Sequence, residues 1–178
     1  MAIVERRGID INVVRPECVP AHLVTPREME VVQCLADGYL HREIGQLMGI
    51  AVKTVEKHGR DIRLIGMSKY ENAMKDEYPH QKRITILSLI QDGIVNGYLT
   101  HKPPEEPIIP LSLREDEVLG LVSQGMTYGE IAQNLWLSVK TIQAYMEHIG
   151  IKLGTRNYYH TVARATYLKL HGMWPTSK

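Results

Sequence analysis

The sequence predicts an all-α protein of two tandem helix-turn-helix modules, each with four helices, joined by a Pro-rich linker. Three observations favour this class. A segment of the chain occurs twice, each copy carries signals for the start and end of helices, and several prolines separate the copies. Shifted by 87 positions, residues 25–38 align with residues 112–125, and residues 43–55 align without a gap with residues 130–142.

The first helix of each copy opens on a capping-box pattern, T-x-x-E at residues 25–28 and S-x-x-E at residues 112–115. In such a box the hydroxyl accepts a hydrogen bond from an early backbone N–H, and the glutamate accepts one from the amide of the capping residue. Glycine commonly follows the last residue of a helix. Gly38 and Gly125 therefore predict where these two helices end.

Three more helices are expected in each copy: a short one, a longer one after a tight turn, and a fourth. Their predicted ranges are residues 42–48, 52–65 and 82–96 in the first copy, and residues 128–135, 139–153 and 158–171 in the second. A single four-helix module buries only a marginal core. We therefore expect the modules to pack on each other, on the N-terminal segment or on a second chain.

Irregular segments set the predicted domain boundaries. Residues 100–110 contain four prolines, which lack the amide donor and favour an extended, stiff linker. The modules then span residues 23–99 and 111–178, preceded by an arm at residues 1–22. The stretch at residues 73–83 has no counterpart in the second copy and is interpreted as an insertion before the fourth helix.

A short helix, a tight turn and a longer helix are typical of the helix-turn-helix, in which the last helix enters the major groove of DNA. The second copy, with "LSLRE", "EIAQNL", "SVKTI" and "KLG", resembles the LuxR/FixJ/GerE-type DNA-binding domain. The first copy is similar through "LVTPREMEVVQCLADG" and "EIGQLMGIAVKTVEKH". Members of that family usually carry a receiver or ligand-sensing domain upstream, and the arm is too short to hold one.

The first copy departs from the family pattern at the start of its third helix. Ala51 stands where the family prefers a capping serine, which Ser138 supplies in the second copy. Glu56 and Gln143 occupy the position where the family has a lysine. Because of these departures, the two copies are not expected to contact DNA in the same way.

Helical spacing separates an outward face from an inward one on each third helix. The resemblance implies that the outward positions meet base edges, and that the helix start with its threonine approaches phosphates. General chemistry agrees, because helix N-termini bind phosphate and long polar side chains reach bases. The predicted DNA-binding residues are Lys53, Thr54, Glu56, Lys57 and Arg60 in the first copy, and Ser138, Lys140, Thr141, Gln143, Ala144 and Glu147 in the second.

The two outward faces differ in charge. The first is net cationic and the second neutral, so we expect the first copy to be the stronger electrostatic anchor. Arg60 is suited to bidentate contact with guanine and Gln143 to contact with adenine. Glu56 and Glu147 lower affinity near phosphates unless they accept a hydrogen bond from a cytosine amine.

No catalytic function is expected. The sequence has no Gly-rich phosphate loop, no H-E-x-x-H and no G-x-S-x-G motif. Cys18 and Cys34 lack metal-like spacing, so neither a metal nor another cofactor is predicted. Trp136, in the turn before the third helix, is interpreted either as a partner contact or as a residue packed on the fourth helix. Trp174 is expected to be buried.

Length, composition and motifs together predict a sequence-specific DNA-binding transcriptional regulator of bacterial or phage origin, with double-stranded DNA as its partner. The formal net charge of +1 gives no overall attraction to DNA, so binding has to depend on local charge. No apolar run is long enough to cross a bilayer, which predicts a cytoplasmic, nucleoid-associated protein with no membrane partner.

Two alternatives stay open. One is a sigma-like factor associated with RNA polymerase. The other is a protein-interaction module in which one helix-turn-helix no longer reads DNA, and the low net charge and the acidic residues on both faces favour it. A homodimer and a regulatory partner protein are also compatible with the sequence.

Overall fold

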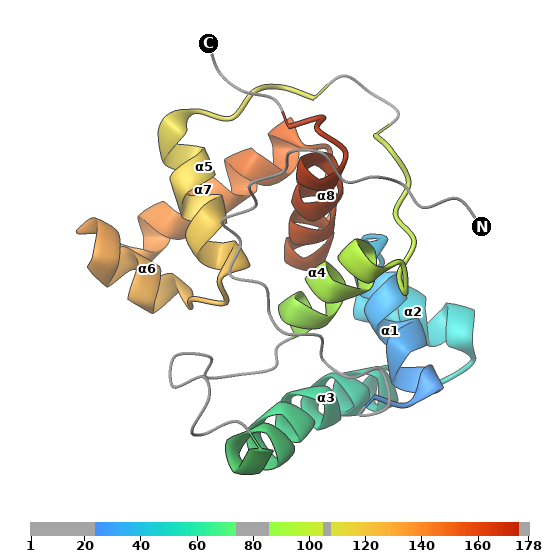
Figure 1. The fold of residues 1–178 in the computed structure, drawn as a ribbon. Coiled ribbons are helices and arrows are strands. Elements are labelled where there is room, and N and C mark those ends of the chain that lie inside the picture. The colour runs from blue at the N-terminus through green and yellow to red at the C-terminus, as the bar shows by residue number, and fades with distance from the viewer. Residues whose placement is uncertain (1–23, 74–85, 105–107, 175–178) are drawn as a thin grey trace.

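The computed structural model describes residues 24–73, 86–104 and 108–174 of the chain. Over these ranges the chain forms eight α-helices and no strand, which confirms the predicted all-α class (Figure 1). The predicted arm at residues 1–22, most of the insertion and part of the linker lie outside the described residues. The helices are α1 Pro26–Ala36, α2 His41–Met48, α3 Val52–Ala73, α4 Ile86–Asn96, α5 Leu113–Ser123, α6 Tyr128–Leu135, α7 Val139–Lys152 and α8 Tyr158–Leu170.

The end of α3 is the largest difference from the predicted boundaries. The prediction stopped this helix at residue 65, whereas the helix continues through Ala73. Gly66 lies inside it, because a glycine in a helix interior costs only about 1 kcal/mol relative to alanine. Proline would cost far more, and none occurs between residue 27 and residue 78. The other described boundaries agree to within a residue, apart from the start of α4, where residues 82–85 are outside the described range.

Both predicted capping boxes are present at the starts of α1 and α5. The backbone N–H groups of Thr25 and Ser112 each donate to the following box glutamate at 2.7 Å. A third box, from Thr127 to Glu130, begins α6. Positive φ values of 91° at Gly38 and 81° at Gly125 confirm that these glycines end α1 and α5.

Helices α4 and α8 lie side by side between the two halves of the molecule (Figure 1). Each half has its own apolar core, and each core includes a residue from the other half. Leu87 of α4 belongs to the core built mainly from α5 to α8, and Ala163 of α8 belongs to the core built mainly from α1 to α4. The halves therefore pack on each other, which is one of the three arrangements expected from the sequence.

Polar contacts reinforce this packing at the start of α8. Arg156 forms an ion pair with Glu43 of α2, with 2.7 Å between Nη2 and Oε1. The Asn157 side chain donates to the Tyr39 carbonyl at 3.2 Å. The buried His160 ring lies directly against Gly38.

An arginine between two histidines completes the interface. Arg164 Nε donates to His101 Nε2, and Arg164 Nη2 lies by His160 Nε2, each at 3.1 Å. Burial, reinforced by the Arg164 charge, lowers the pKa of both histidines to about 4. Both rings are therefore neutral near pH 7, which lets a ring nitrogen accept a hydrogen bond from the guanidinium.

Candidate nucleic-acid interface

The starts of α3 and α7 differ as the sequence predicts. The Ser138 hydroxyl accepts a hydrogen bond from the Thr141 backbone N–H at 3.0 Å and caps α7. At the start of α3, Ala51 has no side-chain acceptor, and its carbonyl accepts from the N–H groups of Thr54 and Val55. Both helices still present early backbone N–H groups toward solvent, which is the arrangement that favours an anion.

The inward and outward faces of both helices also match the prediction. The outward side chains are all exposed, and Thr54 and Thr141 are half-buried. The eight outward residues are Lys53, Glu56, Lys57, Arg60, Lys140, Gln143, Ala144 and Glu147. The inward residues Val55 and Ile62 of α3, and Ile142, Met146, Ile149 and Leu153 beside α7, are buried. The structure thus leaves the predicted faces accessible, while contact with DNA remains a prediction.

Charge on the two faces is unequal. Three cations and one carboxylate stand on α3, against one cation and one carboxylate on α7. Within the described ranges, none of Lys53, Lys57, Arg60 and Lys140 takes part in a salt bridge. Cations that are not already paired are free to neutralise phosphates.

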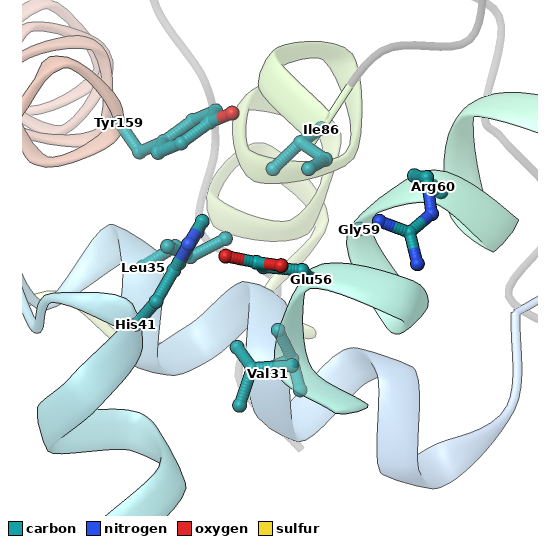
Figure 2. A pocket seen from close by; sticks show the side chains of 9 residues that line it. Val31, Leu35, His41, Glu56, Gly59, Arg60, Ile86 and Tyr159 are labelled. Atoms are coloured by element: carbon teal, nitrogen blue, oxygen red, sulfur yellow. The ribbon is translucent and has the colours of Figure 1, made fainter. Parts of the chain in front are cut away.

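A hollow of about 270 Å³ lies beside the outward face of α3 (Figure 2). Figure 2 shows Glu56 of α3 and His41 of α2 projecting into it, with Tyr159 of α8 on the opposite side. The hollow exists partly because Gly59 has no side chain, whereas the residue 87 positions later is the buried Met146. Glu56 and Arg60 are therefore exposed on the rim of a groove and not on a flat surface.

The turns before α3 and α7 have the same backbone conformation and different residues. Gly49, which ends α2, has φ 65°, and Trp136, which ends α6, has φ 56°. Within the part of the chain that the structure describes, Trp136 is the one non-glycine residue with positive φ. Its side chain is 93% exposed, which rules out packing on the fourth helix. Trp174 instead packs partly buried against the second core, with the Lys169 ammonium 4.5 Å from its ring centroid.

In the described ranges, no cluster of three or more His, Cys, Asp or Glu side chains could hold a metal ion. Cys34 is a half-buried free thiol whose pKa is raised, mainly by burial, and Cys18 lies outside the described residues. Among the helices of the described ranges, none combines the length and apolar character needed to cross a membrane.

Sequence reasoning missed the polar interface around Arg164. Its members come from the linker and from α8, and their positions in the sequence show no shared spacing. A weak signal exists at the "TRN" that precedes α8, where Asn157 caps the helix and Arg156 reaches α2. Nothing local indicates which partner these residues contact.

A short helix, a turn and a longer helix with an exposed outer face occur twice in this fold, and they define a helix-turn-helix protein. The family model of bacterial regulatory proteins of the luxR family matches residues 22–64 and 109–165. The chain belongs to this family, and its class is that of DNA-binding transcription regulators.

Curated relatives match a shorter part of the chain. Oxygen regulatory protein NreC from Staphylococcus aureus, for example in strains MRSA252 and JH9, is 36% identical over 83 residues. The match covers 47% of this chain and 38% of the relative, so the chain corresponds to well under half of the length of NreC. No solved structure matches the chain significantly.

Proposed function

We propose that the chain is a sequence-specific transcriptional regulator in which two tandem LuxR-type modules, residues 23–99 and 111–178, both bind double-stranded DNA. In each module the third helix, α3 or α7, reads base edges, and its start binds phosphate. The support is the exposure of all eight outward side chains on helices whose opposite faces are buried. A helix that is docked on its scaffold along one face can enter a major groove with the other.

The observation that carries this proposal is the shared packing of α4 and α8. Because each core includes a residue of the other half, α3 and α7 belong to one packed body. Two DNA-binding elements on one body make the second contact intramolecular, which raises affinity without new contacts. The chain then acts as a covalent equivalent of a dimer of single modules.

The two modules contribute unequally to DNA affinity. The cationic face of α3 supplies most of the electrostatic affinity, and the neutral face of α7 contributes mainly through Ser138, Lys140 and Gln143. The matched relatives are named oxygen regulatory proteins, and a regulatory role is the part of that name we extend to this chain.

The test begins by selecting bound duplexes from random DNA and measuring Kd for the best one. Lys57→Ala with Arg60→Ala should weaken binding more than Gln143→Ala with Glu147→Ala, because only the first pair removes net positive charge. Lys53→Ala should weaken binding to all sequences alike and flatten the salt dependence by about one unit, as loss of a phosphate contact does. Lys102→Ala removes an exposed cation of the linker and serves as the control.

Equal losses of DNA affinity from the two double variants would contradict the unequal contribution of the two modules. If Gln143→Ala with Glu147→Ala has no effect, and half-turn insertions between half-sites do not change binding, α7 does not read DNA. The protein-interaction alternative then applies to the second module. The exposed apolar side chains of Leu113 and Trp136, where the first module has a proline and a glycine, are the observation in its favour.

A further inference from the structure

Trp136 combines two unfavourable features that packing does not explain. Its backbone has φ 56°, a region that bulky side chains rarely adopt. Its side chain is 93% exposed, so the indole gains nothing from burial in the folded chain. At the matching position of the first module, Gly49 has φ 65°, and the same turn forms there with no side chain. Folding alone would favour glycine at position 136.

The turn that carries Trp136 is held firmly in place. The Trp136 N–H donates to the Gln133 carbonyl at 3.4 Å, and the Leu137 N–H donates to the Ala132 carbonyl at 2.9 Å. Arg114 Nη2 of α5 donates to the Leu135 carbonyl at 3.0 Å and ties the end of α6 to the start of α5. The backbone therefore fixes where the indole leaves the surface, and a fixed contact residue loses little entropy on binding.

The position of the turn points to what the indole meets. Trp136 stands two residues before Ser138, the cap of α7, whose start approaches phosphate in the proposed function. Beside each phosphate of a duplex lies a deoxyribose with an apolar C–H surface. An indole offers a wide apolar face and a single N–H donor, which suits a sugar and its neighbouring phosphate. Contacts of this kind position a protein on DNA without reading sequence.

We propose that Trp136 is a DNA-backbone contact of the second module, with its ring against deoxyribose and its Nε1–H donating to a phosphate oxygen. This inference rests on the proposed function and adds a residue to it. Such a contact would also offset the charge difference between the faces, because the outward face of α7 has one cation where that of α3 has three. The second module replaces part of that electrostatic affinity with an uncharged contact.

The experiment compares full-length wild type with Trp136→Gly on the selected duplex. Glycine is the residue of the first module and suits the positive φ, so the variant should unfold at the same denaturant concentration or higher. Kd should rise roughly tenfold, because tryptophan is among the residues whose truncation weakens an interface most. The salt dependence should stay unchanged, because no charge is removed. Leu113→Ala, which trims another exposed apolar side chain, should leave Kd unaltered.

A fluorescence measurement gives an independent readout. Trp174→Phe leaves Trp136 as the one tryptophan of the chain, since the sequence has two. In the free protein acrylamide should quench Trp136 efficiently because the ring is exposed. Bound DNA should shield the ring from acrylamide and change its emission.

The outcomes separate this inference from the proposed function. If wild type binds DNA, Trp136→Gly binds with the same Kd, and acrylamide still reaches Trp136 in the complex, the inference is overturned while the proposed function stands. If wild type binds no selected duplex, both are overturned. If Trp136 is shielded only when RNA polymerase is added, the residue docks on protein, and the DNA contact is likewise overturned.

Discussion

Replacing Gly38 by alanine should loosen the interface between the two halves more than it disturbs either half alone. A Cβ at position 38 would lie 2.5 Å from His160 Nδ1 and 3.2 Å from its Cγ. A Cβ does not approach another heavy atom to 2.5 Å, and the ring cannot simply swing away, because His160 is only 7% exposed. Its displacement would also disturb the contacts with Arg164 and with the Arg156 N–H.

The matching position of the second half provides a control within the same chain. Gly125 has φ 81° against 91° for Gly38, and a Cβ there would meet nothing within 4 Å. Both alanines suffer the left-handed backbone, at about 1–2 kcal/mol. Only Gly38→Ala adds overpacking, at roughly 1–3 kcal/mol. The free energy of unfolding should therefore fall by about 2–5 kcal/mol for Gly38→Ala and by about 1–2 kcal/mol for Gly125→Ala.

Urea unfolding followed by circular dichroism measures both changes. A double-mutant cycle with His160→Ala tests the cause, because removing the ring should reduce the cost of Gly38→Ala to that of Gly125→Ala. Equal destabilisation by the two single variants would refute the reasoning. So would an unchanged cost of Gly38→Ala in the His160→Ala background.

Two further predictions concern stability. Gly59→Ala should raise the free energy of unfolding by about 1 kcal/mol, because its Cβ would meet Ile86 at an ordinary 3.7 Å and partly fill the hollow beside α3. Gly93→Ala should lower the free energy of unfolding, because its Cβ would lie 2.5 Å from the Leu99 side chain. Urea unfolding measures both changes. The pKa values of His101 and His160, lowered to about 4, mean that the unfolded chain binds more protons between about pH 4 and 6.5. The contribution of the two neutral histidines to the free energy of unfolding should be complete above pH 6.5. On acidification it should fall by up to about 1 kcal/mol per pH unit for each histidine, which unfolding curves at pH 7 and pH 5 would show. If the free energy of unfolding of a His101→Gln variant depended on pH as steeply as that of wild type, this prediction would be contradicted.

Local signals predicted most of the helices, and contacts distant in sequence account for what was missed. Caps at Thr25 and Ser112 and the glycines after α1 and α5 depend on neighbouring residues, and each was found where its pattern predicted. The end of α3 was missed, because a single glycine only weakly opposes a helix that has no proline ahead of it.

The outward and inward faces of α3 and α7 were also predictable, since helical spacing alone determines them. What the spacing could not show is the groove beside Glu56, which needs Ile86 and Tyr159 from helices that come later in the chain. The role of α8 as a partner of α4 was equally hidden. Amphipathic helices reveal that a face is buried, and the identity of the covering helix depends on the rest of the fold.

The shared packing of α4 and α8 has a consequence for how the chain matures on the ribosome. The first core includes Ala163, so it stays incomplete until the last helix has been synthesised. Synthesis proceeds at about 5–20 residues per second. For several seconds, therefore, the nascent first half would expose the apolar surface that α8 covers in the finished protein. Burial of that surface depends on the pairing of α8 with α4 and α1, which come much earlier in the chain, and such long-range pairings close slowly. A chain released from the ribosome before α8 is synthesised would carry α3 on a first core whose apolar surface is exposed. Chaperones, which bind exposed apolar surface, would then be its first partners, before any DNA site.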